Sequence, residues 1–277
     1  MLKERYRKMM EMITPGQLIY WWLLRGAMVF ALIDTAFLRG SEYSASNPPI
    51  QIVANLVGMF AFELIQLFFP QKNRLRFLSS SFQNVTALGF FLGSFGGAYL
   101  NLYYILPMYD KALHVFGTAE AVYIGYEYLC ATQLKLRKTA PYQIVNLGAL
   151  GFGFILSSAW EVFEFVYDQF FGGDAQHWNY QLALNEAGGN PEIIFQMFPM
   201  SAERLAERFP IMDTMGDIVL NFLGAFLMYI FLCIRPYRHI GEKDINRRIE
   251  EMNRAARAEQ TNRPSEPAED ETVTVSK

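Results

Sequence analysis

The chain has 277 residues, of which 52% are hydrophobic and 18% are charged, and its formal net charge is −3. The charged fraction lies below the ~25% that is usual for soluble domains, so the composition argues against an ordinary soluble protein. The sequence has no Walker loop, dinucleotide-binding fingerprint or zinc-finger spacing, and no basic patch interleaved with aromatic residues. These absences exclude nucleic acid as a predicted partner.

The apolar residues are grouped in segments about as long as the ~20 residues that a helix needs to cross a bilayer. None of these segments is free of polar residues, which favours a multi-pass bundle over independent anchors. We therefore predict an all-α membrane protein, a bundle of about six transmembrane helices. In chain order, the predicted spans are residues 18–38, 50–70, 83–105, 112–131, 144–166 and 217–234.

The segments around these spans differ in composition. Residues 1–17 form a basic N-terminal segment, and residues 18–234 form the transmembrane domain, which includes one large outer loop at 170–212. Within this loop, residues 191–208 are apolar and then helical in pattern, and we expect them to lie along the outer interface or to cover the spans as a lid. Residues 235–260 predict a charged cytoplasmic helix, and residues 261–277 a disordered acidic tail.

Lysine and arginine residues alternate between the connections, and this alternation sets the orientation of the spans. They precede the first span, lie in the second and fourth connections, and follow the sixth span, whereas the other connections have few of them. We therefore predict that both termini are cytoplasmic. The residues are Lys3, Arg5, Arg7, Lys8, Lys72, Arg74, Arg76, Lys135, Arg137, Lys138, Arg235 and Arg238.

Two charged residues lie inside the first two predicted spans. Arg25 and Glu63 are each about two turns from the inner end of their span. Because a single charge in the bilayer is costly, their equal depth predicts a mutual ion pair. We favour a structural role for this pair over a role in transport.

Three groups of polar residues lie near the outer ends of the fourth, fifth and sixth predicted spans. The acidic residues of each group recur every three or four positions, so they share one helix face. If the three spans are neighbours, the groups converge on one site in the outer third of the bundle. The groups are Asp110 and His114 with Lys111; Glu161, Glu164 and Asp168 with Trp160; and Asp213, Asp217 and Asn221.

So many carboxylates cannot all be ionised in a low-dielectric site unless a cation lies among them. A set dominated by carboxylates, with one histidine, suits Mg²⁺, Mn²⁺ or Ca²⁺, and Zn²⁺ or Fe²⁺ less specifically. The predicted metal ligands are Asp110, His114, Glu161, Glu164, Asp213 and Asp217, and the predicted catalytic residues are Glu161, His114 and Asp217. Lys111, Trp160, Asp168 and Asn221 are predicted to support them. Two alternatives remain open: metal-free acid–base chemistry by Glu161 or His114, and a network that only links the helices.

The same residues carry a family resemblance. The ordered motifs YDKALH at 109–114, WEVFE at 160–164 and DTMGDIVLN at 213–221 resemble the YjdF-like membrane proteins and, more distantly, the VanZ-like family. The VanZ-like middle motif usually has Glu and Gln and then Arg, so the Glu-x-x-Glu form here is closer to the YjdF-like version. The resemblance covers residues 109–229 and implies a multi-pass protein of the bacterial plasma membrane, with the motif residues near the outer face.

Three functions fit this interpretation. The first is a metal-assisted hydrolase or transferase that acts on a lipid or lipid-linked envelope substrate at the extracytoplasmic face. The second is a proton- or cation-coupled transporter, with a polar path through Asp34, Glu120, Glu127, Glu63 and Arg25. The third is a non-catalytic scaffold whose polar network holds the bundle together. In each case the partner is the lipid bilayer.

Overall fold

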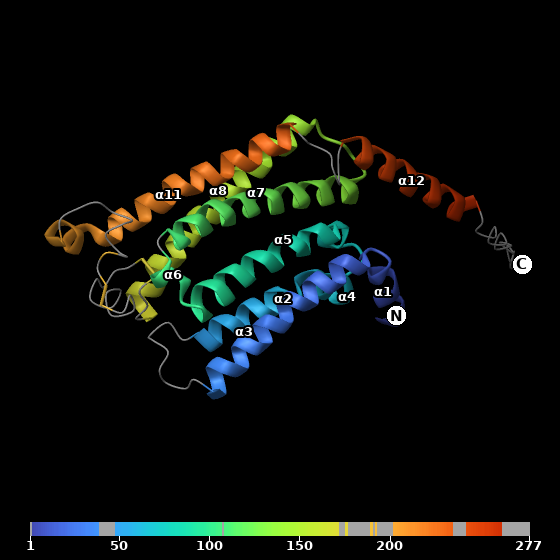
Figure 1. The fold of residues 1–277 in the computed structure, drawn as a ribbon. Helices are drawn as coiled ribbons and strands as arrows, with labels where there is room; N and C mark the ends of the chain where they lie inside the picture. The colour runs from blue at the N-terminus through green and yellow to red at the C-terminus, as the bar shows by residue number, and fades with distance from the viewer. Residues whose placement is uncertain are drawn as a thin grey trace, which may run out of the picture.

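The computed structural model describes residues 2–38, 48–106, 108–171, 175–176, 189–190, 192, 202–234 and 242–261. Throughout these residues the regular structure is helical, as the sequence predicts (Figure 1). Most of the predicted outer loop at 170–212 and of the predicted acidic tail lies outside the described residues, and so does most of the segment expected to act as a lid.

Three long helices that follow residue 108, here called the C-terminal group, pack against one another (Figure 1). Small residues allow the close approach: a Cβ atom added to Gly153 would overlap with Val122, and one added to Gly224 would overlap with the carbonyl oxygen of Val115. The apolar core of this group includes Tyr126. The helices are α7 (Tyr109–Leu136), α8 (Tyr142–Phe171) and α11 (Ala202–Ile234).

A second group of helices comes from the N-terminal half. Its core contains Met28, Ile52 and Ala87. A capping box formed by Thr14 and Gln17 starts the first helix of the group. The elements are α2 (Pro15–Ile33), η1 (Asp34–Leu38), α3 (Pro48–Gly58), α4 (Ala61–Phe68), η3 (Arg74–Phe77), α5 (Ser80–Phe91) and η4 (Leu92–Tyr99).

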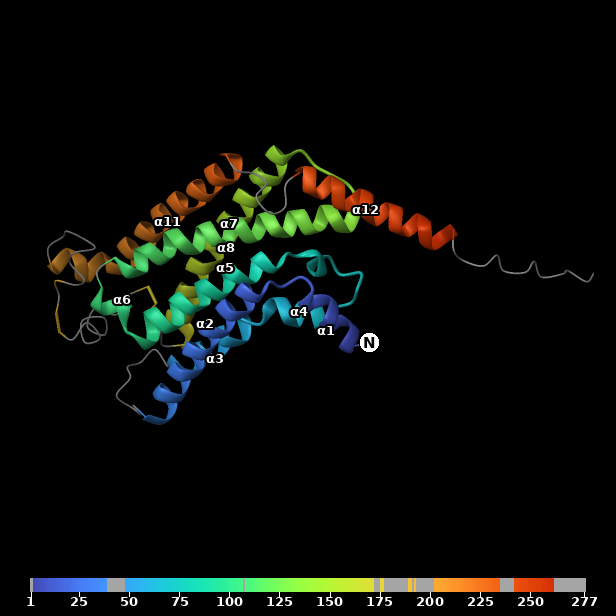
Figure 2. The ribbon, with the colours of Figure 1, turned by 45° about the vertical axis from the view of Figure 1, so that its right-hand side comes forward.

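Two amphipathic helices flank the bundle at the same end (Figures 1 and 2). Helix α1 (Leu2–Met10) is tied to α4 by the Arg5 guanidinium, which donates hydrogen bonds to the carbonyl oxygens of Leu67 and Phe69. Helix α12 (Glu242–Thr261) buries Ile245 and Ile249 in the core of the C-terminal group. Helix α12 corresponds to the charged helix that the sequence predicts over 235–260.

The second predicted span is not one straight helix. Helices α3 and α4 meet at an angle of 50°. The break frees the carbonyl oxygen of Met59, which accepts hydrogen bonds from Arg25 and Gln83. Arg25 Nη2 also lies 2.6 Å from Glu63 Oε1, so the two residues predicted to pair are in contact. The segment predicted as a span at 50–70 is therefore a bent helix pair, whose interrupted backbone is satisfied by side chains from other helices.

The third predicted span is also divided. Helix α5 continues into η4, a π-helix, and the chain then turns at Asn101 before the short helix α6 (Leu102–Ile105). Asn101 has a φ of 57°, which a continuous helix does not allow. Gly97 makes room for the ring of Tyr103, because a Cβ atom there would overlap with it. The continuous span expected at 83–105 is therefore a helix, a π-helix and a turn.

Three helical segments among the described residues are long and apolar enough to cross a membrane: residues 15–37, 142–171 and 213–234. The bent pair α3–α4 makes a fourth if it counts as one span. Helix α7 is 28 residues long, but ionisable residues such as Glu120 and Glu127 interrupt its apolar sequence. The described part of the chain thus contains candidate membrane spans, whereas a full set of six stays a prediction.

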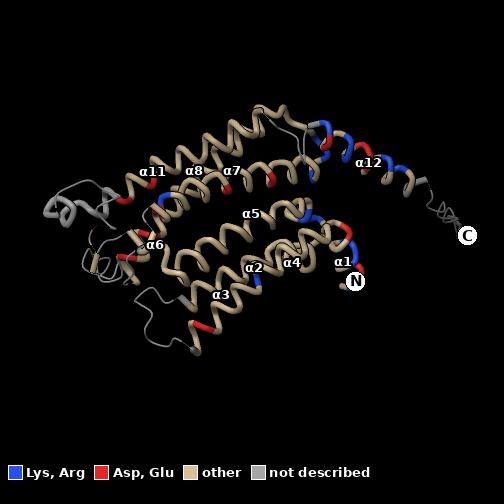
Figure 3. Tube along the Cα trace, in the orientation of Figure 1, with Lys and Arg blue, Asp and Glu red and all other residues tan. Residues whose placement is uncertain are grey.

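Basic residues are concentrated at one end of the bundle, where α1 and α12 also contain acidic residues (Figure 3). The basic residues of α1, η3 and α12 gather at the end where the N-terminus lies, and acidic residues gather at the opposite ends of α7, α8 and α11. Helix α11 starts at Ala202 and so continues 15 residues before the predicted start of the sixth span at 217. The residues expected to form a separate helical segment after Ser201 belong to this longer helix.

Candidate functional site

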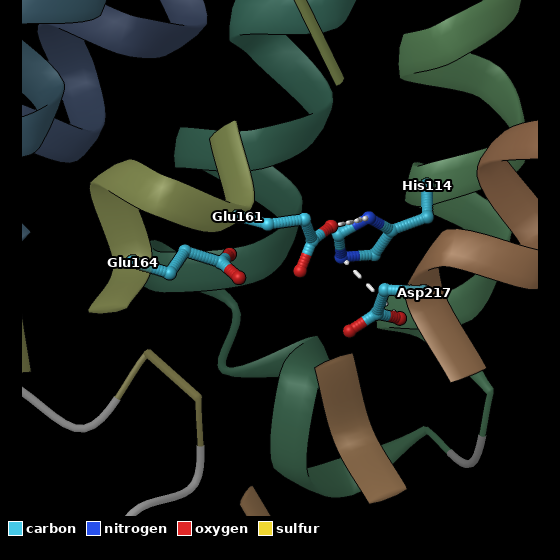
Figure 4. Close-up of side chains that lie close together, drawn as sticks. All are labelled: His114, Glu161, Glu164 and Asp217. Carbon is cyan, nitrogen blue, oxygen red and sulfur yellow. Dashed lines mark ion pairs between the residues drawn. The ribbon is translucent and has the colours of Figure 1, made fainter. Parts of the chain in front are cut away.

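The three polar groups that the sequence singles out meet at one end of the α7–α8–α11 group (Figure 4). Helix α7 contributes His114, α8 contributes Glu161 and Glu164, and α11 contributes Asp217. All four side chains are buried. Their convergence requires the fourth, fifth and sixth predicted spans to be neighbours, and α7, α8 and α11 do pack on one another.

The imidazole of His114 lies between carboxylates from all three helices. Its Nε2 is 3.5 Å from Asp217 Oδ1 and 3.6 Å from Asp110 Oδ1, and its Nδ1 is 3.6 Å from Glu161 Oε1. These distances are longer than hydrogen bonds of normal length. The imidazole therefore faces carboxylates on both sides without being locked to any one of them.

A second acidic group surrounds Lys111, which directly follows Asp110 on α7. Its ammonium nitrogen is 2.6 Å from Asp213 Oδ1, 2.7 Å from Asp217 Oδ1 and 3.1 Å from Asp110 Oδ2. The lysine is only 4% exposed. The sequence predicts Lys111 as a supporting residue of the site, and its single positive charge is shared among three aspartates.

Asn221 joins the site to the helix interfaces. Its amide nitrogen donates to Glu161 Oε1 at 3.1 Å, and its amide oxygen accepts from the hydroxyl of Thr118 at 2.6 Å. The bond fixes the direction of the Glu161 carboxylate. Sequence reasoning missed Thr118, although its position four residues after His114 places it on the same face of α7.

The remaining residues on α8 have partners of different kinds. The indole nitrogen of Trp160 donates to Glu164 Oε1 at 2.7 Å. The carboxylate of Asp168 accepts hydrogen bonds from the backbone N–H groups of Ala175 and Gln176 at 2.6 and 2.7 Å. Asp168 thus fixes the turn that follows α8, and among the described residues it belongs to neither acidic group.

Two buried carboxylate oxygens of the site lack a hydrogen-bond partner among the described residues: Glu161 Oε2 and Asp217 Oδ2. Their residues are 7% and 1% exposed. Leaving a buried charged acceptor unsatisfied costs about 1–3 kcal/mol or more, which marks the pair as an incomplete arrangement.

The same residues belong to a set with the donor chemistry of a metal site. One ligand atom from each of His114, Glu161, Glu164 and Asp217 lies within 4.8 Å of the others. Asp110, Asp213 and Asp217 form a second set of this kind, but Lys111 contacts all three. The first set therefore suits a divalent cation better than the second.

Other residues named from the sequence lie elsewhere. Asp34, named in the polar path of the transporter alternative, is in η1 of the N-terminal group and accepts a hydrogen bond of 2.9 Å from the hydroxyl of Tyr99. Glu120, on the same polar path, lies in α7 with its side chain against Gly89 of α5.

Comparison with known protein families matches residues 20–238 to a family described as a predicted membrane protein (DUF2238). The match covers the α2–α11 region and all residues of the site. No curated protein and no solved structure matches the chain. The family match supports a membrane protein, and the more specific resemblance to YjdF-like and VanZ-like proteins stays a prediction.

Proposed function

The chain belongs to the DUF2238 family of predicted membrane proteins, and we propose that it binds one divalent cation in the His114–Glu161–Glu164–Asp217 set. In this proposal the cation serves a hydrolase or transferase reaction on a lipid or lipid-linked substrate of the bacterial envelope. The site lies at the extracytoplasmic end of a multi-pass bundle in the plasma membrane.

The observation that carries the proposal is the pair of unpartnered, buried oxygens on Glu161 and Asp217. Both residues face the imidazole of His114, at 3.6 and 3.5 Å. One ligand atom of each carboxylate also lies within 4.8 Å of one from the other. Like-charged carboxylates this close repel one another, and a cation between them would remove the repulsion and give the unpartnered oxygens a partner. The Lys111 ammonium lies 2.7 Å from Asp217 Oδ1, which is the other oxygen of that carboxylate.

The proposed orientation is supported by the distribution of basic residues. Helices α1 and α12 are basic in part and lie at the end of the bundle opposite the site (Figure 3). Because basic flanks stay on the cytoplasmic side, this arrangement favours cytoplasmic termini and an extracytoplasmic site.

The cation, Glu161 and Lys111 have different roles in the proposed reaction. A bound divalent cation would polarise a phosphoryl or acyl oxygen, or lower the pKa of a bound water. Glu161, oriented by Asn221, accepts a proton from the attacking water or hydroxyl group. Lys111 offsets one negative charge among the three aspartates that it contacts.

Two measurements test the proposal: the metal content of the purified protein and its activity in turning over lipids. Elemental analysis of wild type is expected to find one divalent cation per chain, and Glu161→Gln and Asp217→Asn are expected to lose it. Asp34→Asn is the matched control, because it neutralises another buried carboxylate outside the acidic sets and should keep the cation. Turnover of a membrane lipid extract should fall in the first two variants only.

Two results together contradict the proposal. The wild type contains no metal after purification in the presence of Mg²⁺ and Mn²⁺, and neither Asp217→Asn nor His114→Ala changes lipid turnover. Ion flux in proteoliposomes that is abolished by neutralising Glu63 supports the transporter alternative instead. Variants of the site that only lower the amount of folded protein support the scaffold alternative.

A further inference from the structure

A cavity of about 550 Å³ lies between the N-terminal and C-terminal helix groups, away from the carboxylate–histidine site. Its volume falls within the ~300–1,000 Å³ that is typical of small-molecule sites. The wall is mostly apolar and aromatic and comes from α2, α5, α7 and α11. It includes Tyr20, Val85, Leu88, Phe116, Met228 and Glu120.

The carboxylate of Glu120 is the unusual group in this wall. It makes no hydrogen bond or ion pair with any residue that the structure describes. The other polar groups of the wall already have partners: the amide of Gln17 donates to Ser80 Oγ at 3.1 Å, and Asn84 Oδ1 accepts from the Trp21 indole at 2.7 Å. One unpaired acidic group therefore faces an apolar space.

The backbone opposite Glu120 is shaped to receive its side chain. A Cβ atom added to Gly89 on α5 would overlap with Glu120 Oε2. The glycine thus lets the carboxylate lie against α5 at the cavity wall. Any larger residue at this position would displace the carboxylate.

We propose that this cavity binds a lipophilic organic cation, an ammonium or phosphonium ion with an apolar body, and that Glu120 is its counter-ion. The apolar wall accepts the body of such a ligand, and the single carboxylate selects its charge. The rings of Tyr20 and Phe116 add attraction, because aromatic faces stabilise cations that are poorly hydrated. An anionic or neutral ligand of the same shape leaves the carboxylate uncompensated.

The cavity is separate from the proposed metal site. Glu120 follows His114 by six residues, which turns it by roughly 120° around α7. Glu120 therefore faces α2 and α5, whereas His114 faces α8 and α11. Cation binding here does not rest on the proposed function, and the two proposals fail independently.

Equilibrium dialysis of the purified full chain in detergent, with radiolabelled tetraphenylphosphonium as the probe, tests the proposal. Wild type is expected to bind one tetraphenylphosphonium ion per chain. Glu120→Gln is expected to bind it at least about tenfold more weakly, because the variant lacks one unit of negative charge in a low-dielectric wall. Tetraphenylborate has nearly the same shape and the opposite charge, so it should not bind to a saturable site in wild type.

Two further variants separate charge from folding. Gly89→Ala keeps the carboxylate but displaces it, so it should weaken tetraphenylphosphonium binding as well. Glu127→Gln removes a carboxylate one heptad along α7 that hydrogen-bonds Ser79 and Tyr123, and it should leave binding unchanged. Equal probe binding by wild type and Glu120→Gln, equal binding of tetraphenylborate, or no saturable binding by wild type each overturns the proposal.

Discussion

The positive charge of Lys111 offsets part of the negative charge at the acidic end of the bundle. Its ammonium contacts Asp110, Asp213 and Asp217, and it is buried together with the last two. The sequence placed Lys111 beside the acidic motifs but did not indicate which carboxylates it meets, because two of the three belong to a helix about a hundred residues later. That kind of contact depends on packing, which residue spacing does not encode.

Replacing Lys111 by Met tests this balance. Removing one partner of a buried ion pair costs about 3–5 kcal/mol, so we expect a lower melting temperature in metal-free buffer. Millimolar Mg²⁺ or Mn²⁺ should restore part of the loss, because a divalent cation can then occupy the vacated position among the aspartates. Thermal denaturation with and without the cations measures both effects.

The control is Lys8→Met, which removes an exposed lysine from a surface pair with Glu4 and should leave the melting temperature unchanged. A Lys111→Met variant as stable as wild type in metal-free buffer contradicts the assigned role.

At the residue scale, sequence spacing predicted which residues share a helix face, but not which partners they contact. The three- and four-residue intervals correctly put Glu161 with Glu164, and Asp213 with Asp217, on single faces. The same intervals do not show that Asp168 accepts hydrogen bonds from Ala175 and Gln176 beyond the end of α8. Its partners are backbone groups beyond the helix. The spacing of polar residues in the sequence does not distinguish such partners from side chains on neighbouring helices.

At the scale of elements, the interface between α7 and α11 positions the site. Gly224 lies against the carbonyl oxygen of Val115, one residue after His114. The absence of a side chain on α11 thus allows Asp217 and Asn221 to reach the groups on α7.

Gly224→Ala should separate the two helices and disturb the site. Overpacking of a close contact typically costs about 1–3 kcal/mol, so we expect reduced stability together with weaker metal binding. Gly117→Ala is the matched control on α7, because a Cβ atom there meets nothing within 4 Å. Since alanine favours helices, the control should be neutral or stabilise by up to about 1 kcal/mol. Unchanged metal binding by Gly224→Ala argues against the importance of this interface.

Hydropathy predicted where apolar helices lie better than where they break. The second predicted span bends at Met59 because Arg25 and Gln83, from two other helices, satisfy its free carbonyl. A window average records the apolar character of residues 50–70 but not these partners. In the same way, the start of α11 differs from the prediction because its polar first turns are helical without being apolar.

At the scale of the whole molecule, the segregation of charge favours one orientation in the membrane (Figure 3). Single cysteines in a background that lacks Cys130 and Cys233 test it. In intact cells, Lys72→Cys and Lys138→Cys should be protected from a membrane-impermeant maleimide, whereas Gly40→Cys and Gly173→Cys should be labelled. Permeabilised cells supply the control, since all four positions should then react. Labelling of Lys138→Cys in intact cells reverses the orientation and moves the site to the cytoplasmic face.

The binding of a divalent cation by His114 and its carboxylate neighbours is the central claim, and pulsed electron paramagnetic resonance of Mn²⁺-loaded protein tests it most directly. Wild type should show coupling between Mn²⁺ and one imidazole nitrogen, because His114 is the histidine of the set. His114→Gln should lose this coupling, and Asp34→Asn should keep it. Wild type that binds no Mn²⁺, or nitrogen coupling that persists in His114→Gln, contradicts the account.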